Sequence, residues 1–390
     1  MGNVPNLRFP EFSGEWVTKS INDLAVVIGG GTPDTTVKSY WDGEIQWFTP
    51  SEIGKNKYVD SSLRTITEVG LNNSSAKLLP PNTILLSSRA TIGECSLSLR
   101  ECATNQGFQC LVSKKCNVDF LYYLIQTKKK DLIRKSCGST FLEISANEVR
   151  KIQVSVPSDV EQQKIAELLS LIDERIATQN KIIEKLQSLI KGLIDDIITL
   201  KCGQLVAFET LYSKAGEGGT PTTSNTEFYD NGSIPFIKID DLSNKYLSAN
   251  KDYITELGLK KSSAWLIPTH SIIYSNGATI GAISINKYPV CTKQGILGIV
   301  PNTNIDVEFL YYFMQSSYFQ KEVERVVTEG TMKTAYLKDI NHIKCPIPDL
   351  DRQKEISHFL SVLSLKEDVE RQLLQKYQIQ KQYLLRKMFI

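Results

Sequence analysis

Hydrophobic residues recur at alternating steps of four and three along one stretch of the chain. The eleven positions, ten of them aliphatic, are Ile165, Leu169, Ile172, Ile176, Gln179, Ile183, Leu186, Ile190, Leu193, Ile197 and Leu200. Such a seam is typical of a helix that pairs with another helix in a coiled coil. Pro157 ends the preceding strand, Ser158 is suited to cap the helix, and Glu161 completes a capping-box pattern. We therefore predict a helix of about 40 residues, roughly 60 Å long.

A second segment of the same character follows Pro348, with Asp349 as the expected cap. Its seam is looser, because apolar positions alternate with charged ones. The fitting residues are Ile356, Leu360, Leu363, Leu374, Tyr377, Leu384 and Met388, whereas Glu367, Glu370 and Lys381 interrupt the pattern. We predict that the two helices form an antiparallel coiled coil with pseudo-two-fold symmetry. The alternative is two independent helices, each lying on the surface of its own domain.

The segments that precede the two helices repeat one another. Residues 66–80 and 254–268 share ten identities in fifteen aligned positions, at a spacing of 188 residues. The tetrapeptide at 90–93 recurs at 278–281, and Phe-Leu-Tyr-Tyr at 120–123 recurs at 309–312. A repeat of this length corresponds to a whole folded domain rather than to a solenoid module.

Within each copy, short β-rich runs alternate with turns and helical stretches. The strands are expected near 45–49, 83–87, 108–112 and 151–156, and helices at 119–129 and 307–315. This pattern predicts an α+β fold with a mostly antiparallel sheet. The domain organisation that follows is a first globular domain at 1–155, a helix at 156–202, a second globular domain at 203–345 and a helix at 346–390.

The composition is that of an ordinary globular protein, with 41% hydrophobic and 23% charged residues. No apolar run is long enough to span a membrane, and a secretory signal is not expected at residues 1–12. The eight cysteines form no Cys-x-x-Cys pair, which favours reduced thiols and a cytoplasmic location. The net charge of +2 is low for a protein that wraps DNA alone. Either this chain does not bind DNA, or a partner supplies much of the phosphate contact.

Motifs for catalysis are missing from the sequence. It has no Walker A run, no G-x-S-x-G elbow and no Asn/Asp-Pro-Pro-aromatic motif, and its three histidines are scattered. Acidic residues with a lysine occur near 159–164 and 349–354, as in some nucleases. Both clusters lie at predicted helix starts, where acids favour the helix dipole, so capping explains them better. We therefore predict a non-catalytic chain without a metal site.

Small polar loops recur in both copies and carry side chains suited to reading base edges and phosphates. The Gly-Thr-Pro turns at 31–33 and 219–221 are equivalent, and the loops at 87–91 and 275–279 each follow a strand. The candidate DNA contacts are Ser87, Ser88, Arg89, Thr91, Asn105, Gln106, Ser275, Asn276, Thr279, Lys293 and Gln294. The alternative is that these loops are structural turns of an α+β fold.

The order of these elements resembles the specificity subunit of type I restriction-modification systems. The resemblance spans the chain and includes the opening Leu-Arg-Phe-Pro-Glu-Phe at 7–12, the Gly-Thr-Pro turns, the Ala-Thr-Ile-Gly loops and the helix start at 157–166. It implies that each globular copy is a target recognition domain for one half of a bipartite DNA site. It also implies that the two helices act as spacer and docking surface.

The partners implied by the resemblance are double-stranded DNA, two methyltransferase subunits and a restriction subunit that translocates DNA. S-adenosylmethionine, ATP and Mg²⁺ would belong to those partners and not to this chain. The implied docking and seam residues are Ile165, Leu169, Ile172, Ile176, Ile183, Leu186, Ile190, Leu193, Ile197, Ile356, Leu360, Leu363 and Leu374. The candidate loops differ between the copies, which predicts an asymmetric site. A coiled-coil scaffold that never touches nucleic acid is the alternative function.

Overall fold

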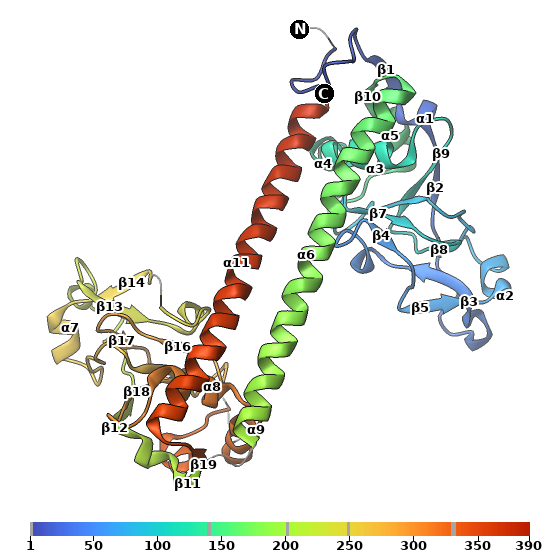
Figure 1. The fold of residues 1–390 in the computed structure, drawn as a ribbon. Helices are drawn as coiled ribbons and strands as arrows, with labels where there is room; N and C mark the ends of the chain where they lie inside the picture. The colour runs from blue at the N-terminus through green and yellow to red at the C-terminus, as the bar shows by residue number, and fades with distance from the viewer. Residues whose placement is uncertain (1–2, 139–141, 200–202, 248–249, 329–332) are drawn as a thin grey trace. The chain divides into compact units, whose positions relative to one another are not determined.

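The computed structural model describes residues 3–138, 142–199, 203–247, 250–328 and 333–390. The chain forms two compact units (Figure 1). Unit 1 comprises residues 1–181 and 371–390, and unit 2 comprises residues 182–370. Each unit therefore contains one globular domain and a part of each of two long helices. The domain boundaries expected from the sequence remain predictions.

The elements of the first domain end at the first long helix. They are β1 (Val17–Ser20), α1 (Ile21–Leu24), β2 (Ala25–Gly29), η1 (Lys38–Tyr40), β3 (Trp41–Phe48), η2 (Pro50–Glu52), β4 (Tyr58–Val59), β5 (Arg64–Ile66), α2 (Glu68–Asn72), β6 (Ile84–Leu86), β7 (Cys95–Ser98), β8 (Cys102–Thr104), β9 (Gln109–Ser113), α3 (Val118–Thr127), α4 (Lys129–Arg134), α5 (Ala146–Lys151), β10 (Gln153–Val156) and α6 (Asp159–Thr199).

The second domain follows a similar order and ends at the second long helix, with η3 in place of α1 and a single β-bridge at Tyr246 in place of β4. Its elements are β11 (Gln204–Ala207), η3 (Phe208–Leu211), β12 (Tyr212–Glu217), η4 (Thr226–Phe228), β13 (Ile234–Ile237), η5 (Ile239–Asp241), β14 (Asp252–Ile254), α7 (Glu256–Lys260), β15 (Ile272–Ser275), β16 (Ile283–Ile285), β17 (Cys291–Thr292), β18 (Ile296–Pro301), α8 (Val307–Gln315), α9 (Ser317–Val326), α10 (Leu337–Ile340), β19 (Lys344–Ile347) and α11 (Leu350–Met388).

The sheets of the two domains correspond closely. The larger sheet has the order β2-β9-β6-β7-β4 in unit 1 and β12-β18-β15-β16 in unit 2. A smaller sheet has the order β5-β3-β8 or β14-β13-β17, and a two-stranded sheet pairs β1 with β10 or β11 with β19. The pairings are antiparallel except β3–β8, β4–β7 and β13–β17. The expected α+β class and duplicated domain are thus confirmed.

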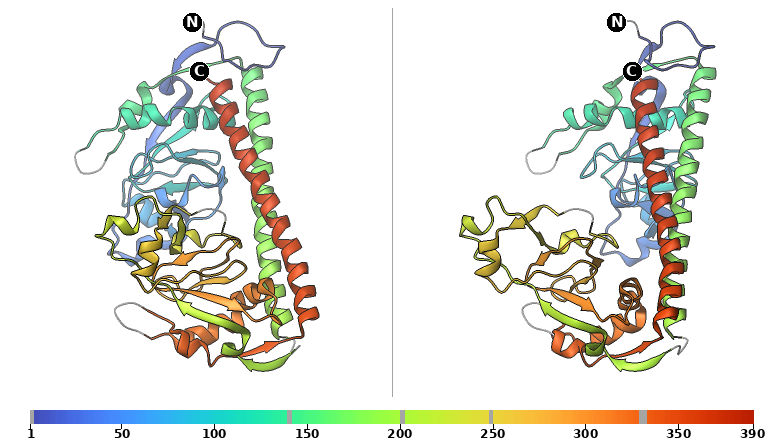
Figure 2. Two further views of the ribbon diagram at one scale, coloured as in Figure 1. Left: turned by 90° about the vertical axis from the view of Figure 1, so that its left-hand side faces the viewer. Right: turned by 60° about the vertical axis from the view of Figure 1, so that its left-hand side comes forward.

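A buried helix forms the centre of each domain core, and the two helices share the aromatic sequence Phe-Leu-Tyr-Tyr. Phe120 and Tyr123 of α3 are fully buried, and Phe309 and Tyr312 of α8 are nearly so. Asn117 and Asp306 cap these helices by accepting a hydrogen bond from the third residue of the helix. Figure 2 shows α8 beside α11 in unit 2. The domain core is therefore continuous with the long helices.

The two long helices pair inside each unit, as the seam predicts. In unit 1, Ile165 and Leu169 of α6 share a buried cluster with Met388 of α11. Asp173 of α6 forms an ion pair with Lys381 of α11 at 2.7 Å, so the two segments run antiparallel. In unit 2, a second buried cluster joins α6 and α11. Its helix residues include Ile190, Ile194, Ile356 and Leu360. The alternative of independent surface helices is wrong.

The described seam positions of α6 are all buried or half-buried, whereas Leu200 lies outside the described residues. One expectation for α11 needs correction. Glu370 and Lys381 were expected to break the heptad, yet Glu370 is only 8% exposed and Lys381 pairs with Asp173. Glu370 also forms an ion pair with Lys366, one turn before it. Lys381 therefore contributes a polar contact between the two helices, and Glu370 is buried although it is charged.

The predicted helix starts are present, with one difference. Ser158 accepts a hydrogen bond from the amide of Glu161 at 3.4 Å, and Asp349 accepts one from the amide of Arg352 at 2.9 Å. The carboxylate of Glu161, however, does not complete a capping box. It accepts two hydrogen bonds of 2.8 Å from the guanidinium of Arg8, so it fastens the N-terminal segment to α6 instead.

Candidate nucleic-acid interface

Two turns meet at one edge of the first domain. The turn after β2 lies against the turn after β8, because the amide of Gly31 donates to the carbonyl of Thr104 at 2.8 Å. The hydroxyl of Thr32 donates to the side-chain oxygen of Gln106 at 2.5 Å. A side chain of the repeated Gly-Thr-Pro turn therefore positions a candidate base-reading side chain.

The loop after β6 joins the same edge. The amide of Ser88 donates to the carbonyl of Gly107 at 2.8 Å, and the hydroxyl of Ser87 donates to the carbonyl of Arg89 at 2.8 Å. Ala90 has a φ of 54°, a left-handed conformation that is uncommon for a residue with a Cβ. The loop is thus held in a defined shape by its own buried hydroxyl.

The repeated glycines explain part of the sequence identity between the copies. A Cβ atom on Gly31 would lie 2.2 Å from Oγ of Ser75, and one on Gly219 would lie 2.2 Å from Oγ of Ser263. Only glycine permits this approach between the turn and the repeated Ser-Ser-Ala segment. The identities therefore maintain the geometry of the turn in each domain.

The second domain builds the same edge. The amide of Gly219 donates to the carbonyl of Thr292 at 3.0 Å, and the amide of Asn276 donates to the carbonyl of Gly295 at 3.1 Å. The carboxylate of Glu217 accepts a hydrogen bond from the amide of Gly295 at 2.9 Å. Equivalent backbone hydrogen bonds thus bring the three loops together in both units, although some of the exposed side chains on these loops differ.

Seven of the eleven candidate contacts have side chains that reach the surface. Gln106, Thr91, Thr279, Lys293 and Gln294 are exposed, and Arg89 and Asn105 are half-exposed. Asn105 accepts a hydrogen bond from the amide of Gly107 at 2.8 Å through its side-chain oxygen, which fixes the direction of its amide group. These seven residues remain predicted DNA contacts.

The other four candidates are placed differently from the prediction. Ser87, Ser88, Ser275 and Asn276 are at most 1% exposed, so in this conformation they offer no surface to a ligand. The side-chain amide of Asn276 donates to the carbonyl of Ala335 at 3.1 Å. The alternative of a structural turn fits these four buried residues better. Ser87 and Asn276 use their side chains within the domain, and Ser88 and Ser275 hydrogen-bond through their backbone amides.

One electrostatic partner at the interface was not recognised from the sequence. Glu143 forms an ion pair of 2.8 Å with Arg89, and both side chains are partly exposed, at 35% and 42%. No acidic residue occupies the equivalent position in the second copy, so comparison of the two copies could not identify Glu143. Thr32, by contrast, lies in a repeated motif and could have been included. The ion pair with Glu143 therefore offsets part of the positive charge that Arg89 brings to this edge.

Among the described residues, no three His, Cys, Asp or Glu side chains are arranged to hold a metal ion. Burial raises the pKa of the Cys110 and Cys345 thiols to about 12, so both are protonated at neutral pH. Within the described residues, no helix is long and apolar enough to cross a lipid bilayer.

The chain thus carries two related α+β domains, each followed by a long helix, and the two helices pair with each other. The comparisons with known proteins identify the family. The model of the type I restriction modification DNA specificity domain matches residues 13–188 and 212–377. The chain therefore belongs to the type I restriction-modification DNA specificity family, and it is a specificity subunit and not a catalytic one.

Individual relatives agree with this assignment. The chain is 30% identical to the MjaIX specificity subunit of Methanocaldococcus jannaschii over 359 residues, covering 86% of this chain and 83% of that protein. It is 26% identical to the EcoR124I/EcoR124II specificity subunit of Escherichia coli, over 63% of each chain. The fold is similar to that of the S subunit from M. genitalium, with a TM-score of 0.59, 16% identity and 99% of both chains covered.

A second solved chain has a similar fold. It comes from work on complex assembly and conformational transition of the type I R-M system, with a TM-score of 0.62 and 14% identity. The match covers 97% of this chain and 98% of that chain.

Proposed function

We propose that this chain reads a bipartite, asymmetric DNA site, with each unit contacting one half. The observation that carries the proposal is the loop edge that is built twice with different exposed side chains. Arg89 aligns with Gly277, and Asn105 aligns with Lys293. Identical readers would select a palindrome, whereas these differences favour two unlike half-sites.

The proposed partners are two methyltransferase subunits and a restriction subunit, acting in the cytoplasm. The seam residues are used between α6 and α11, so partner docking requires another surface. Four apolar side chains of α11 supply one, because they are 49–63% exposed and lie within about a third of the helix circumference. They are Phe359, Val362, Leu365 and Val369. An exposed apolar stripe of this kind favours a protein partner.

The proposed cofactors belong to those partners. S-adenosylmethionine would be used by the methyltransferase subunits, and ATP and Mg²⁺ by the restriction subunit. The low net charge of +2 supports this division, because a partner that contributes phosphate contacts reduces the charge this chain needs.

Methylome sequencing tests the proposal directly. Strains with and without this chain should differ by one methylated bipartite motif. Replacing residues 1–155 with the corresponding domain of a relative should change one half of that motif and leave the other intact. A change in both halves would contradict the assignment of one half-site to each unit. If the purified chain with its methyltransferase subunit bound no DNA at any salt concentration, the scaffold function would replace this one.

A further inference from the structure

We propose that a lysine cluster in each unit fixes the recognition domain on its long helix. The cluster thereby determines how many base pairs between the two half-sites the complex accepts. The Lys245 cluster of unit 2 consists of Lys245, Glu308, Tyr312 and Ser361. The inference rests on the proposed function, because it concerns how the two half-sites are read together.

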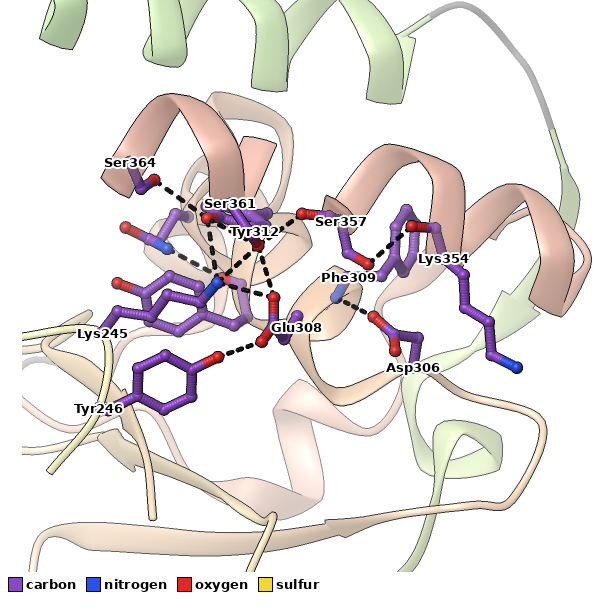
Figure 3. A network of polar contacts seen from close by, with 12 residues as sticks. Lys245, Tyr246, Asp306, Glu308, Phe309, Tyr312, Lys354, Ser357, Ser361 and Ser364 are labelled. Atoms are coloured by element: carbon purple, nitrogen blue, oxygen red, sulfur yellow. Dashed lines mark hydrogen bonds and ion pairs between the residues drawn. The ribbon is translucent and has the colours of Figure 1, made fainter. Parts of the chain in front are cut away.

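The ammonium group of Lys245 is held from three directions (Figure 3). It lies 2.8 Å from the carboxylate of Glu308 on α8 and donates to the hydroxyl of Ser361 on α11 at 2.8 Å. It is also 3.2 Å from the hydroxyl of Tyr312, whose ring centroid is 4.8 Å away. Tyr246 next to it donates a hydrogen bond to Glu308 as well. One side chain therefore joins a loop, a core helix and a long helix.

Unit 1 contains the same arrangement. In the Lys57 cluster, the ammonium group of Lys57 lies 2.6 Å from Asp119 and donates to Ser170 on α6 at 2.7 Å. It stands 5.0 Å from the ring centroid of Tyr123. The tripeptide Asn-Lys-Tyr occurs at 56–58 and again 188 residues later. Each partner is repeated too, although the acid is aspartate in one copy and glutamate in the other.

The position of the lysine in the domain indicates what the cluster does. Lys245 lies in the connection between β13 and β14, and its carbonyl accepts a hydrogen bond at 2.7 Å from the amide of Ile285 on β16, an edge strand of the larger sheet. In the same sheet, β15 leads into the loop at 275–279, which contains the candidate contact Thr279. The cluster therefore ties the sheet that bears a recognition loop to α11.

The lysines are more deeply buried than their acidic partners. The side chains of Lys57 and Lys245 are only 6% and 15% exposed, so each ammonium group depends on its partners. The carboxylates of Asp119 and Glu308 remain 31% and 28% exposed. Loss of the lysine would leave an acid that water can still reach, so the domain should fold without the tie.

The test compares methylation of DNA duplexes that differ only in the gap between half-sites. The full chain is assembled with its methyltransferase subunit, and rates are measured on the cognate gap and on gaps one base pair shorter and longer. We expect Lys245→Met and Lys57→Met each to lower the preference for the cognate gap about tenfold, which corresponds to about 1.4 kcal/mol. The bases required within each half-site should stay the same.

Two further variants separate positioning from general stability. Lys287→Met is the matched control, because Lys287 stands 4.3 Å from the ring centroid of Tyr246 but, among the described residues, forms no ion pair and no hydrogen bond to a long helix. Combining Lys245→Met with Glu308→Leu removes both charges and should restore stability. We expect this double variant to regain its melting temperature and still accept altered gaps.

The outcomes are distinct. The proposal would be overturned if both lysine variants kept the wild-type preference for the cognate gap, or if they changed the bases required within a half-site. It would also be overturned if the double variant recovered both its stability and its gap preference, because the cluster would then act only on folding. A wild-type complex that methylates no bipartite site would instead refute the proposed function itself.

Discussion

At the scale of single residues, the repeat located the interface but did not show which side chains face outward. The small hydroxyl residues of the loops were reasonable candidates, yet Ser87 and Ser275 are fully buried, and Ser87 donates its hydroxyl to the carbonyl of Arg89 in its own loop. Sequence identity between copies marked structural positions such as Gly31 and Gly219. The exposed residues that differ between the copies, such as Arg89 and Asn105, are the candidates for reading unlike half-sites.

Glu143 is expected to restrain Arg89, which gives the first prediction. Glu143→Gln should remove the ion pair and one negative charge from the interface. A surface pair of this kind contributes about 0–1 kcal/mol to stability, so the fold should be preserved. DNA affinity of the complex should rise roughly threefold to tenfold, with a steeper dependence on salt by about one phosphate contact.

Fluorescence anisotropy at several salt concentrations measures this effect. Asp60→Asn is a suitable control, since it breaks another exposed ion pair, with Arg100. If Arg89→Ala left affinity unchanged and Glu143→Gln did the same, Arg89 would not be a DNA contact.

Glu308 makes the stability of unit 2 dependent on pH. Burial by itself would raise the pKa of Glu308, but hydrogen bonds from Lys245, Ser361 and Tyr246 outweigh it, and the net effect lowers the pKa below its ordinary value of 4.5. A carboxyl whose pKa is lower in the folded state stabilises the fold above its unfolded pKa. That contribution is lost as pH falls through the folded pKa.

We therefore expect Glu308→Gln to lower the free energy of unfolding at neutral pH, with the deficit shrinking below about pH 4.5. Urea titrations of the wild type and the variant across this range measure the difference. A deficit that stayed constant down to the most acidic pH at which both proteins fold would show that the lost contribution is not that of the charged carboxylate.

At the scale of elements, most of the apolar seam of α6 was predictable, because aliphatic residues at alternating steps of four and three over five heptads are typical of a paired helix. The buried Ile194 lies beside the predicted positions. The seam of α11 was only partly predictable. Lys381 interrupts its apolar pattern, but the partner Asp173 lies on the other helix, far away in sequence. A heptad pattern counts hydrophobic residues along one chain segment and cannot detect a charge pair between two segments. The same limit concealed the lysine clusters, although the repeated Asn-Lys-Tyr tripeptide was a visible signal.

The exposed apolar stripe of α11 gives a prediction at this scale. Val362→Glu places a charge at a position that is 53% exposed, so the fold should be retained. Burying that unpaired charge in an interface should weaken binding of the methyltransferase subunit at least tenfold, the effect of roughly 1.4 kcal/mol or more. Copurification and sedimentation measure it. Gln375→Glu adds the same charge to an exposed polar position, and equal binding loss in both variants would contradict docking on the stripe.

At the scale of the whole molecule, the duplicated order of domain and helix was evident from the 188-residue spacing alone. The family followed from that order, since no individual motif is specific. The recognised bases did not follow, because they depend on a few exposed side chains whose directions are set by loops such as the one held by Asn276. Physical chemistry thus predicts the architecture more completely than the specificity.

The final prediction concerns the helices as a spacer. The boundary between the units falls after residue 181 in α6 and after residue 370 in α11. Inserting four residues at both places lengthens each helix by the same amount, about 6 Å, with a net rotation of about 40°. On DNA that rise corresponds to about two base-pair steps and that rotation to about one. We expect the methylated motif to retain both half-sites while its gap widens by one to two base pairs, as read by methylome sequencing. If the complex remained active on the original gap, the helices would not determine the spacing.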